Sequence, residues 1–346
     1  MDELTDVINL ESLANWMSEA GLGDGPIESP QLLAGGTQNY LMKFRKGKRE
    51  FVLRRPPRHL RKNSNETMIR EARVLNALRN STVPHPELIA ACEDQSVLSC
   101  CFYLMEPIHG FNPREGLPNL HKGDPGIRHR MGLSMVEGLT ELGNIDYMAV
   151  GLDGFGKPEG FLQRQVPRWI SQLESYKEFD NWPGPSVLPG TDSISVWLEA
   201  NIPTDFSPGI MHGDYHMANV MFSYDGPEMV AIVDWELCTI GDPLLDLGWL
   251  MAVWADPEEE RPPSIEPWYG FPTIDEMIQH YARHSSRDMS SVGWYGVLAC
   301  FKLGVILEGT YARYCAKLAS KETGELLHAH AIDLFKRAGR MINKLS

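Results

Sequence analysis

Three polar residues in the middle of the chain have the types and spacing that phosphoryl transfer requires. Asp214 and Asn219 belong to the run His-Gly-Asp-Tyr-His-Met-Ala-Asn at 212–219, and Asp234 follows a short apolar run. One carboxylate can take the proton of an attacking hydroxyl, while the amide and the other carboxylate hold Mg²⁺ on nucleotide phosphates. A single loop aspartate is more often a turn residue, but chance is a poor explanation for all three.

Two short strands are expected to bring Asn219 and Asp234 together. Residues 220–222 and 229–233 are apolar runs on either side of the turn Ser-Tyr-Asp-Gly-Pro, a pattern typical of a β-hairpin. The hairpin would place Asn219 and Asp234 at one end of its ribbon.

A cation nearer the N-terminus is predicted to contact nucleotide phosphates, and a carboxylate is predicted to orient it. Period-two alternation in the strand 51–55 puts Val52 and Arg54 on one face. The helix expected over residues 65–78 carries Glu71 on its apolar stripe, where a carboxylate needs a cationic partner. Arg54 is the best candidate for that partner. The alternative is that Glu71 lies at the edge of the stripe and is solvated.

A glycine-rich turn and a hinge complete the expected nucleotide site. The turn consists of Gly35, Gly36, Thr37, Gln38 and Asn39. The turn is typical of a β-hairpin, and it also suits a flap whose backbone N–H groups approach phosphates. The two interpretations are compatible. Residues 97–98 and 101–105 are expected to be strands that lead into a hinge, where backbone groups of Met105, Glu106 and Ile108 would bind an adenine edge.

The chain after the hinge is expected to be mostly helical. Periodic apolar patterns predict helices at 128–148, 163–176, 193–200, 244–254, 273–285, 292–314 and 324–344. A further helix is expected near the N-terminus, where the pattern from Leu10 stops at Gly21.

Composition excludes several classes of protein. The 346 residues suffice for two lobes, and the net charge of −14 argues against general nucleic-acid binding. The six cysteines include no Cys-x-x-Cys pair, so neither a zinc site nor a redox motif is indicated. No apolar run is expected to span a membrane. The acidic N-terminus and the absence of a peroxisomal tripeptide favour a cytoplasmic location. The oligomeric state is left open.

The motifs together resemble the aminoglycoside phosphotransferase and choline kinase group of small-molecule kinases. Within it, the chain looks most like the kinase-like domains associated with acyl-CoA dehydrogenases. The resemblance covers roughly residues 25 to 340. It is carried by the Arg54 strand, the Glu71 helix, Arg164-Gln165 with Trp169, the 212–219 loop, Asp234-Trp235-Glu236, and Gly241-Asp242-Pro243 with Asp246-Leu247.

The resemblance implies an α+β, bilobal, protein-kinase-like fold. It implies an N-terminal nucleotide-binding lobe with an antiparallel sheet at 1–105, a hinge at 106–110 and a larger, mainly helical lobe at 111–346. ATP and Mg²⁺ would be the cofactors.

The resemblance also implies a role for each motif residue. Asp214 is the expected base, Asn219 and Asp234 the metal ligands, and Arg54 replaces the usual phosphate-contacting lysine. His212 and Asp242 would support the loop, with Asp246 more distant. His216 either stabilises transferred charge or only caps the loop.

The phosphoryl acceptor is a small alcohol whose identity the sequence leaves open. A hydroxyacyl compound, including a CoA thioester, would suit Arg164 and Arg168, four residues apart. An aminoglycoside or aminoalcohol would need acidic residues such as Glu174, Glu178 and Asp180. A nucleotide-binding pseudokinase without turnover is the rival from another class. A protein kinase is disfavoured because Asp-Phe-Gly and Ala-Pro-Glu motifs are missing.

Overall fold

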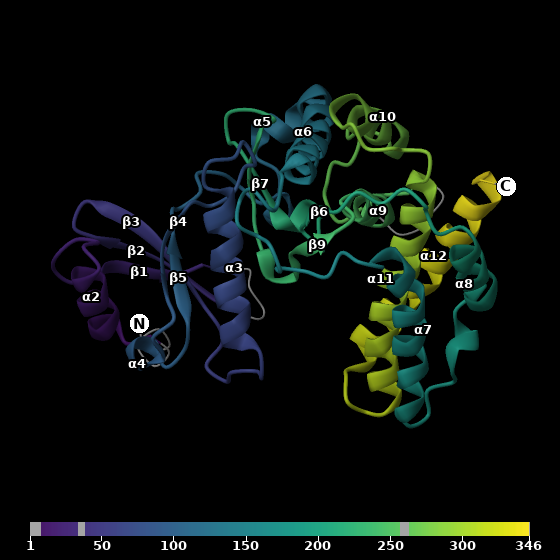
Figure 1. The fold of residues 1–346 in the computed structure, drawn as a ribbon, viewed down its shortest axis with the longest axis horizontal. Helices are drawn as coiled ribbons and strands as arrows, with labels where there is room; N and C mark the ends of the chain where they lie inside the picture. Colours follow the sequence, from purple (N-terminus) through teal and green to yellow (C-terminus); the bar gives the residue numbers. More distant parts are fainter. Residues whose placement is uncertain (1–7, 34–38, 257–262, 346) are drawn as a thin grey trace.

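The N-terminal part of the chain is built around a five-stranded sheet. The computed structural model describes residues 8–33, 39–256 and 263–345. All neighbouring strands are antiparallel, in the order β1-β2-β3-β5-β4. Their bounds are β1 Glu28–Leu32, β2 Tyr40–Lys46, β3 Arg49–Arg55, β4 Leu88–Cys92 and β5 Phe102–Met105. In Figure 1 this sheet lies between helix α2 (Leu10–Glu19) and helix α3 (Ser64–Leu78).

One expected strand is wrong. Residues 95–98 form a helical turn, α4 (Gln95–Leu98), rather than part of a strand. The Asp94 side chain accepts a hydrogen bond from the Ser96 N–H at 2.8 Å and caps this turn, which ends at Ser99 with a positive φ of 60°. A polar cap therefore overrides the apolar pair at 97–98. Besides β3, the strand that pairs with β5 is β4, which was not predicted from the sequence.

Two buried apolar clusters form the core, and α3 joins the larger one. The smaller cluster lies between the sheet and α2 and includes Met17, Phe44 and Leu53. The larger cluster fills the C-terminal part and also contains the inward face of α3, including Met68 and Leu75. Helix α3, which carries Glu71, is thus packed directly onto the part of the molecule that carries Asp214.

Two small antiparallel ribbons hold the segments around Asp214. Strand β6 (Gly209–Met211) pairs with β9 (Thr239–Gly241), and β7 (Val220–Phe222) pairs with β8 (Met229–Ile232). The predicted hairpin is therefore confirmed. Because the Val233 N–H donates to the Asn219 carbonyl at 2.9 Å, Asn219 and Asp234 lie side by side at its open end.

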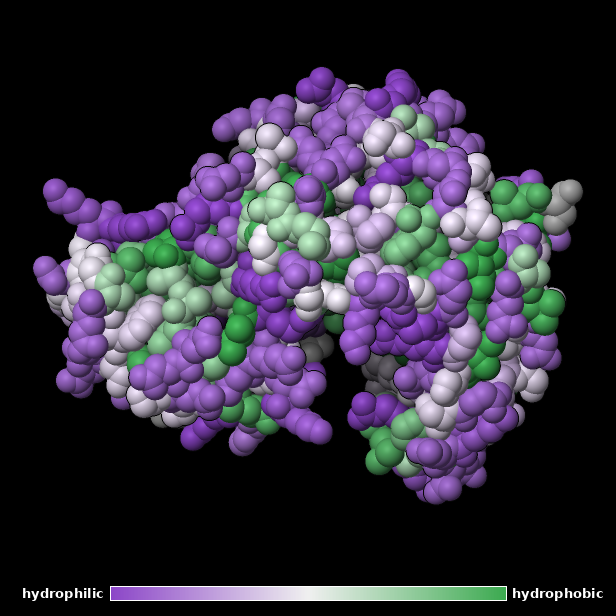
Figure 2. Space-filling model, in the orientation of Figure 1, coloured by the Kyte–Doolittle hydropathy of each residue, from purple (hydrophilic) through white to green (hydrophobic). Residues whose placement is uncertain are grey.

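The remaining elements form the helical part of the molecule, as expected. The helices are α5 Asn119–Gly123, α6 Pro125–Asn144, α7 Gln165–Ser175, α8 Thr191–Ala200, α9 Leu244–Val253, α10 Ile274–His284, α11 Val292–Cys315 and α12 Lys321–Leu345. Within the described ranges there are also single turns of 3₁₀-helix: η1 Pro113–Glu115, η2 Leu162–Arg164, η3 Tyr176–Glu178, η4 Pro185–Val187, η5 Met217–Asn219 and η6 Trp235–Leu237. Figure 2 shows a mostly hydrophilic face with a notch at its lower edge, between the part that carries α3 and the part that carries α7.

Helix α11 is an exception to the expectation that no apolar run is long enough to span a membrane. By length and composition alone, its 24 residues could cross a membrane. However, 61% of its most apolar stretch is buried inside the fold, where it packs between α9 and α12 (Figure 1). Its apolar character is therefore accounted for by the core.

Candidate active site

Asp214 lies in the loop between β6 and β7, and neighbouring donors hold both of its carboxylate oxygens. The Trp249 Nε1–H donates to Oδ1 at 3.0 Å, and Asn219 Nδ2 donates to Oδ2 at 3.1 Å. Nε2 of His216 lies 3.3 Å from Oδ2. Burial opposes ionisation, but the hydrogen bond from His216 and the other contacts outweigh it, so the pKa of Asp214 lies below its usual value. An immobile, ionised carboxylate can orient a hydroxyl and accept its proton.

His216 caps the loop and contacts Asp214 at the same time. Its Nδ1 accepts a hydrogen bond from the Ala218 N–H at 3.1 Å, at the start of η5. Because Nδ1 is an acceptor, we assign the ring proton to Nε2, the nitrogen next to Asp214 Oδ2. The capping contact expected for His216 is present, and the same ring positions Asp214.

Asp246, and not Asp242, braces the loop. Its Oδ2 accepts from the His212 N–H at 2.6 Å, and its Oδ1 accepts from the Gly213 N–H at 2.8 Å. Burial raises the pKa of Asp246 to about 6, opposed by these two hydrogen bonds. Asp242 instead accepts from the Tyr295 hydroxyl at 2.6 Å and caps the start of α9. Asp242 was expected to support the loop, with Asp246 more distant. This prediction was wrong because Asp246, in the first turn of α9, faces the loop.

His212 supports the loop through its ring. Its Nε2–H donates to the Val233 carbonyl at 2.9 Å, and its Nδ1 accepts weakly from the Asp214 N–H at 3.3 Å. Burial lowers the pKa of His212, which keeps the imidazole uncharged. The ring thus ties the Asp214 loop to the end of β8, next to Asp234.

Asn219 and Asp234 fit a magnesium ion by chemistry and position. Both carry oxygen donors and line the same end of the cavity described below. Asp234 has a positive φ of 66°, a conformation that aspartate tolerates better than most residues. Among the described residues there is no group of three or more His, Cys, Asp or Glu that could hold a metal. Two protein ligands are consistent with Mg²⁺, which takes phosphate oxygens and waters as its others.

Arg54 joins the sheet, α3 and the Asp234 turn. Its Nε lies 2.8 Å from Glu71 Oε2, and its Nη2 donates to Asp234 Oδ1 at 2.7 Å. The predicted Arg54–Glu71 pair is therefore confirmed, and the solvated alternative for Glu71 is excluded, because Glu71 is fully buried. Burial raises the pKa of Glu71, opposed by the charge of Arg54 and by a hydrogen bond from the Tyr103 hydroxyl at 2.7 Å. Tyr103 was not anticipated from the sequence.

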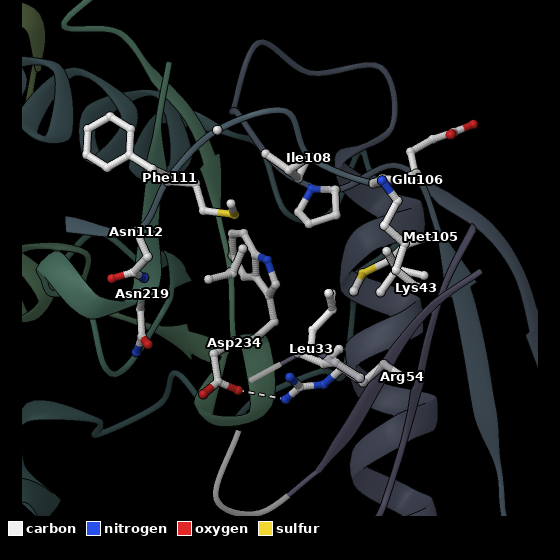
Figure 3. A pocket seen from close by; sticks show the side chains of 18 of the residues that line it. Leu33, Lys43, Arg54, Met105, Glu106, Ile108, Phe111, Asn112, Asn219 and Asp234 are labelled. Atoms are coloured by element: carbon white, nitrogen blue, oxygen red, sulfur yellow. Dashed lines mark hydrogen bonds and ion pairs between the residues drawn. The ribbon is translucent and has the colours of Figure 1, made fainter. Parts of the chain in front are cut away.

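A cavity of about 490 Å³ opens beside these residues (Figure 3). Its wall contains seven of the predicted site residues: Val52, Arg54, Met105, Glu106, Ile108, Asn219 and Asp234. Lining residues that the sequence analysis missed include Lys43, Asn112 and Tyr224. Glu71, Asp214 and His216 do not line it. Glu71 therefore acts on the cavity through Arg54.

The glycine-rich turn is only partly described. Gly35, Gly36, Thr37 and Gln38 lie outside the described residues, so their predicted contact with phosphates stays a prediction. Asn39 is described as a partly buried residue just before β2, and Leu33, on the other side of the turn, lines the cavity.

The hinge offers backbone groups to the cavity. The Glu106 N–H donates to the Glu87 carbonyl at 2.9 Å, and Pro107 has no N–H. The Ile108 N–H has no hydrogen-bond partner among the residues that the structure describes. It is therefore the first hinge donor free to bind a base. The Glu106 side chain forms an ion pair with Arg49 and points away from the cavity in Figure 3.

The two arginines suggested for the acceptor behave differently. Arg164 lies in η2, before α7, and donates to the carbonyls of Lys157 and Glu159. Arg168 is exposed on α7, and its guanidinium carbon lies 5.1 Å from the ring centroid of Trp169. Of the two, only Arg168 therefore has its guanidinium beside an aromatic ring and not on backbone carbonyls.

Comparison with known proteins decides the family. Residues 30–283 match the sequence pattern of the phosphotransferase enzyme family. The chain belongs to this family. Its membership makes the chain a small-molecule kinase, and the fold is the expected α+β, protein-kinase-like one.

The sequence relatives are larger proteins that the chain matches in part. The chain is 30% identical over 318 residues to acyl-CoA dehydrogenase family member 11 of Rattus norvegicus, covering 89% of this chain and 39% of that protein. It is 29% identical over 308 residues to family member 10 of Mus musculus, covering 87% of this chain and 28% of that protein. The chain thus spans well under half the length of these relatives.

Solved structures share the fold over nearly the whole chain. A Ralstonia eutropha protein inferred to be an aminoglycoside phosphotransferase is 27% identical with a TM-score of 0.79, covering 96% of this chain and 99% of that one. A complex of the aminoglycoside phosphotransferase APH(4)-Ia with AMP-PNP and hygromycin B has a TM-score of 0.61 at 14% identity, covering 95% and 99%. At that identity the likeness extends to the fold alone.

Proposed function

We propose that this kinase transfers the γ-phosphate of ATP, bound with Mg²⁺, to a hydroxyl of a small acyl compound. One observation carries the proposal. Asn219, Asp234 and Arg54 gather at one end of the cavity, and Asp214 is bound to Asn219 just outside it. Nucleotide phosphates at that end would therefore face a hydroxyl held by Asp214.

The chemistry follows from these positions. Asp214 orients the acceptor hydroxyl and takes its proton. The hydroxyl oxygen bonds to the γ-phosphorus, the bond from that phosphorus to the β–γ bridging oxygen breaks, and ADP leaves. Arg54, held by Glu71, offsets negative charge on the phosphates.

Asn219 and Asp234 would hold the metal ion. Mg²⁺ bound there would neutralise charge that develops on the phosphate oxygens. Arg54 now contacts Asp234 Oδ1, so the proposal requires this contact to loosen or to be shared when metal and nucleotide bind.

The acceptor class rests on two lines of support. The relatives named above are acyl-CoA dehydrogenase family members, and this chain matches a part of each of them. Arg168 also adds positive charge beside Trp169. Lys302 contacts both Trp169 and Trp249, and Trp249 is the donor to Asp214. Positive charge there suits an anionic acceptor better than an aminoglycoside or choline-like cation. The physiological acceptor is proposed to be a hydroxy acid or its CoA thioester.

An ATP-consumption screen with Asp214→Asn as the comparison tests the proposal. Hydroxy acids, their CoA thioesters, aminoalcohols and aminoglycosides are supplied with ATP and Mg²⁺. The wild type should phosphorylate an acyl compound, and Asp214→Asn should lose about 10²- to 10⁴-fold in kcat while still binding nucleotide. Asp234→Ala should abolish metal-dependent nucleotide binding in calorimetry. Tight ATP binding without transfer to any alcohol would favour a pseudokinase instead.

A further inference from the structure

A lysine from α11 lies next to Asp214's neighbours but outside the nucleotide cavity. Nζ of Lys302 is 4.4 Å from the ring centroid of Trp249 and 5.6 Å from that of Trp169. Trp249 is the side chain that donates to Asp214. None of these residues lines the nucleotide cavity, so the cluster of Lys302, Trp169 and Trp249 lies on another side of Asp214.

The nearby carboxylates already have other donors. Both oxygens of Asp246 accept backbone N–H groups, and both oxygens of Asp214 are held by the donors described above. Within the part of the chain that the structure describes, Lys302 Nζ makes no hydrogen bond and no ion pair. Burial lowers the pKa of Lys302, opposed by the charges of Asp246 and Asp214. Lys302 is half-buried, and an ammonium that loses part of its hydration is costly unless something binds it.

A second donor in the cluster is also unused. The Trp169 indole N–H is buried and has no acceptor among the described residues. Buried donors are almost always paired in native structures. Two donors without hydrogen-bond partners among the described residues lie in one cluster, whose Trp249 donates to Asp214, and they point to an oxygen-bearing ligand that binds beside this cluster.

We propose that Lys302 is the specificity-determining residue of the acceptor site, and that its ammonium binds an acyl oxygen of the molecule whose hydroxyl Asp214 orients. This inference rests on the proposed function and extends it to a named contact. The acyl oxygen is either a carboxylate or the carbonyl of a thioester. A cationic acceptor would be disfavoured there by the like charges of Lys302 and Arg168.

The surroundings leave room for a longer acceptor. An open hollow of about 380 Å³ between α7 and α11 is lined by residues that include Gln172, Ile306 and Arg313. Ile306 is one helical turn beyond Lys302, and Gln172 is one turn beyond Trp169, so the hollow lies along the same two helices as the Lys302 cluster. A free acid would leave it empty, whereas the tail of a thioester could occupy it.

A matched set of acceptors tests the contact. The 2-, 3- and 4-hydroxy forms of pentanoate and their CoA thioesters are compared with pentane-1,4-diol and choline, which lack the acyl oxygen. The wild type should favour the acyl compounds. Lys302→Met should raise the KM for the preferred acyl compound about 10- to 100-fold, leave the KM for ATP unaltered, and remove the preference over the diol. Lys302→Arg should restore part of the preference for acyl compounds over the diol. Whether the free acids or the CoA thioesters are the better acceptors shows which of the two Lys302 binds.

Binding measured without turnover separates this inference from the proposed function. Quenching of tryptophan fluorescence reports acceptor binding, because Trp169 and Trp249 contact Lys302. Lys336→Met, exposed on α12, removes the same charge and should bind acceptors as the wild type does. Equal binding of acyl compounds by wild type and Lys302→Met, or a wild-type preference for the diol or choline, overturns the assignment. Binding that depends on Lys302 without any phosphate transfer counts only against the proposed function.

Discussion

Trp249 donates its indole N–H to Oδ1 of Asp214 at 3.0 Å, so a residue of α9 sets the direction of the proposed base. Replacing it by phenylalanine keeps an aromatic ring and removes the donor. A hydrogen bond to a charged group contributes about 1.5–3 kcal/mol, so Trp249→Phe should lower kcat about 10- to 100-fold. Steady-state kinetics with the preferred acceptor check this.

The buried Trp294 provides the matched control. It is 3% exposed, and its indole N–H donates to the Leu198 carbonyl at 2.9 Å, away from Asp214. Trp294→Phe should cost similar stability and leave kcat near the wild-type value. Equal losses of kcat in both variants would mean that the effect comes from packing rather than from the hydrogen bond to Asp214.

The buried pair of Arg54 and Glu71 should show strong coupling in stability. Arg54→Met leaves Glu71 without its cation, and breaking a buried ion pair in this way costs about 3–5 kcal/mol. Adding Glu71→Gln should recover part of that loss, because the uncompensated charge is gone, while nucleotide binding stays impaired. Urea denaturation and nucleotide calorimetry on both single variants and the double variant measure the two effects.

An exposed ion pair in the same sheet is the control. Arg45 and Glu28 are about half exposed, and surface pairs contribute about 0–1 kcal/mol. Arg45→Met should therefore change the free energy of unfolding by no more than that. Additive losses in the Arg54 and Glu71 double variant would contradict the coupling.

Local patterns were enough to predict much of the site. Alternation in β3 and the apolar stripe of α3 predicted the Arg54–Glu71 pair, and two apolar runs predicted the hairpin that joins Asn219 to Asp234. Both predictions depend on periodicity within a few residues of chain, which secondary structure fixes.

Contacts between distant elements were not predictable in this way. The bracing role of Asp246 was assigned to Asp242, because the two aspartates are four residues apart and only the packing of α9 decides which of them faces the loop. Trp249 and Lys302 were missed for the same reason. Lys302 left a signal, as a lysine within the long apolar pattern of α11.

The two contacts of His216 can be separated by substitution. An asparagine oxygen can replace Nδ1 and accept from the Ala218 N–H, whereas a glutamine amide can replace Nε2 and donate to Asp214. His216→Asn should keep the thermal stability of the loop and lower kcat. It should also move the acidic limb of the rate profile to higher pH. In the wild type, the hydrogen bond from His216 helps to keep the pKa of Asp214 below its usual value, against the effect of burial. Without that hydrogen bond, burial is less opposed and the pKa of Asp214 should rise. His216→Gln should show a smaller change in kcat and a larger loss of stability. If His216→Gln lowered kcat more than His216→Asn did, the capping contact of Nδ1 would be the more important one for catalysis.

Asp246 should give the protein a pH-dependent stability that an asparagine removes. Its pKa is raised to about 6 by burial, against 3.8 when the chain is unfolded, so the folded state binds the proton more tightly. The stability contributed by this group is fully present below the unfolded pKa and is lost as pH rises through about 6. The difference in unfolding free energy between the wild type and Asp246→Asn should therefore shrink by about 2 kcal/mol from pH 4.5 to pH 7.

The same variant should also lower activity. An asparagine amide at position 246 places an N–H against one of the N–H groups of His212 and Gly213, so the loop that carries Asp214 loses an acceptor. Asp242→Asn, two residues before α9 begins, disturbs only the contact with Tyr295 and the hydrogen bond from the Leu244 N–H, and should reduce stability with little change in kcat. Urea denaturation at several pH values, with kcat measured near pH 7.5, distinguishes the two aspartates. A pH-independent difference between wild type and Asp246→Asn would show that Asp246 titrates as it does in the unfolded chain.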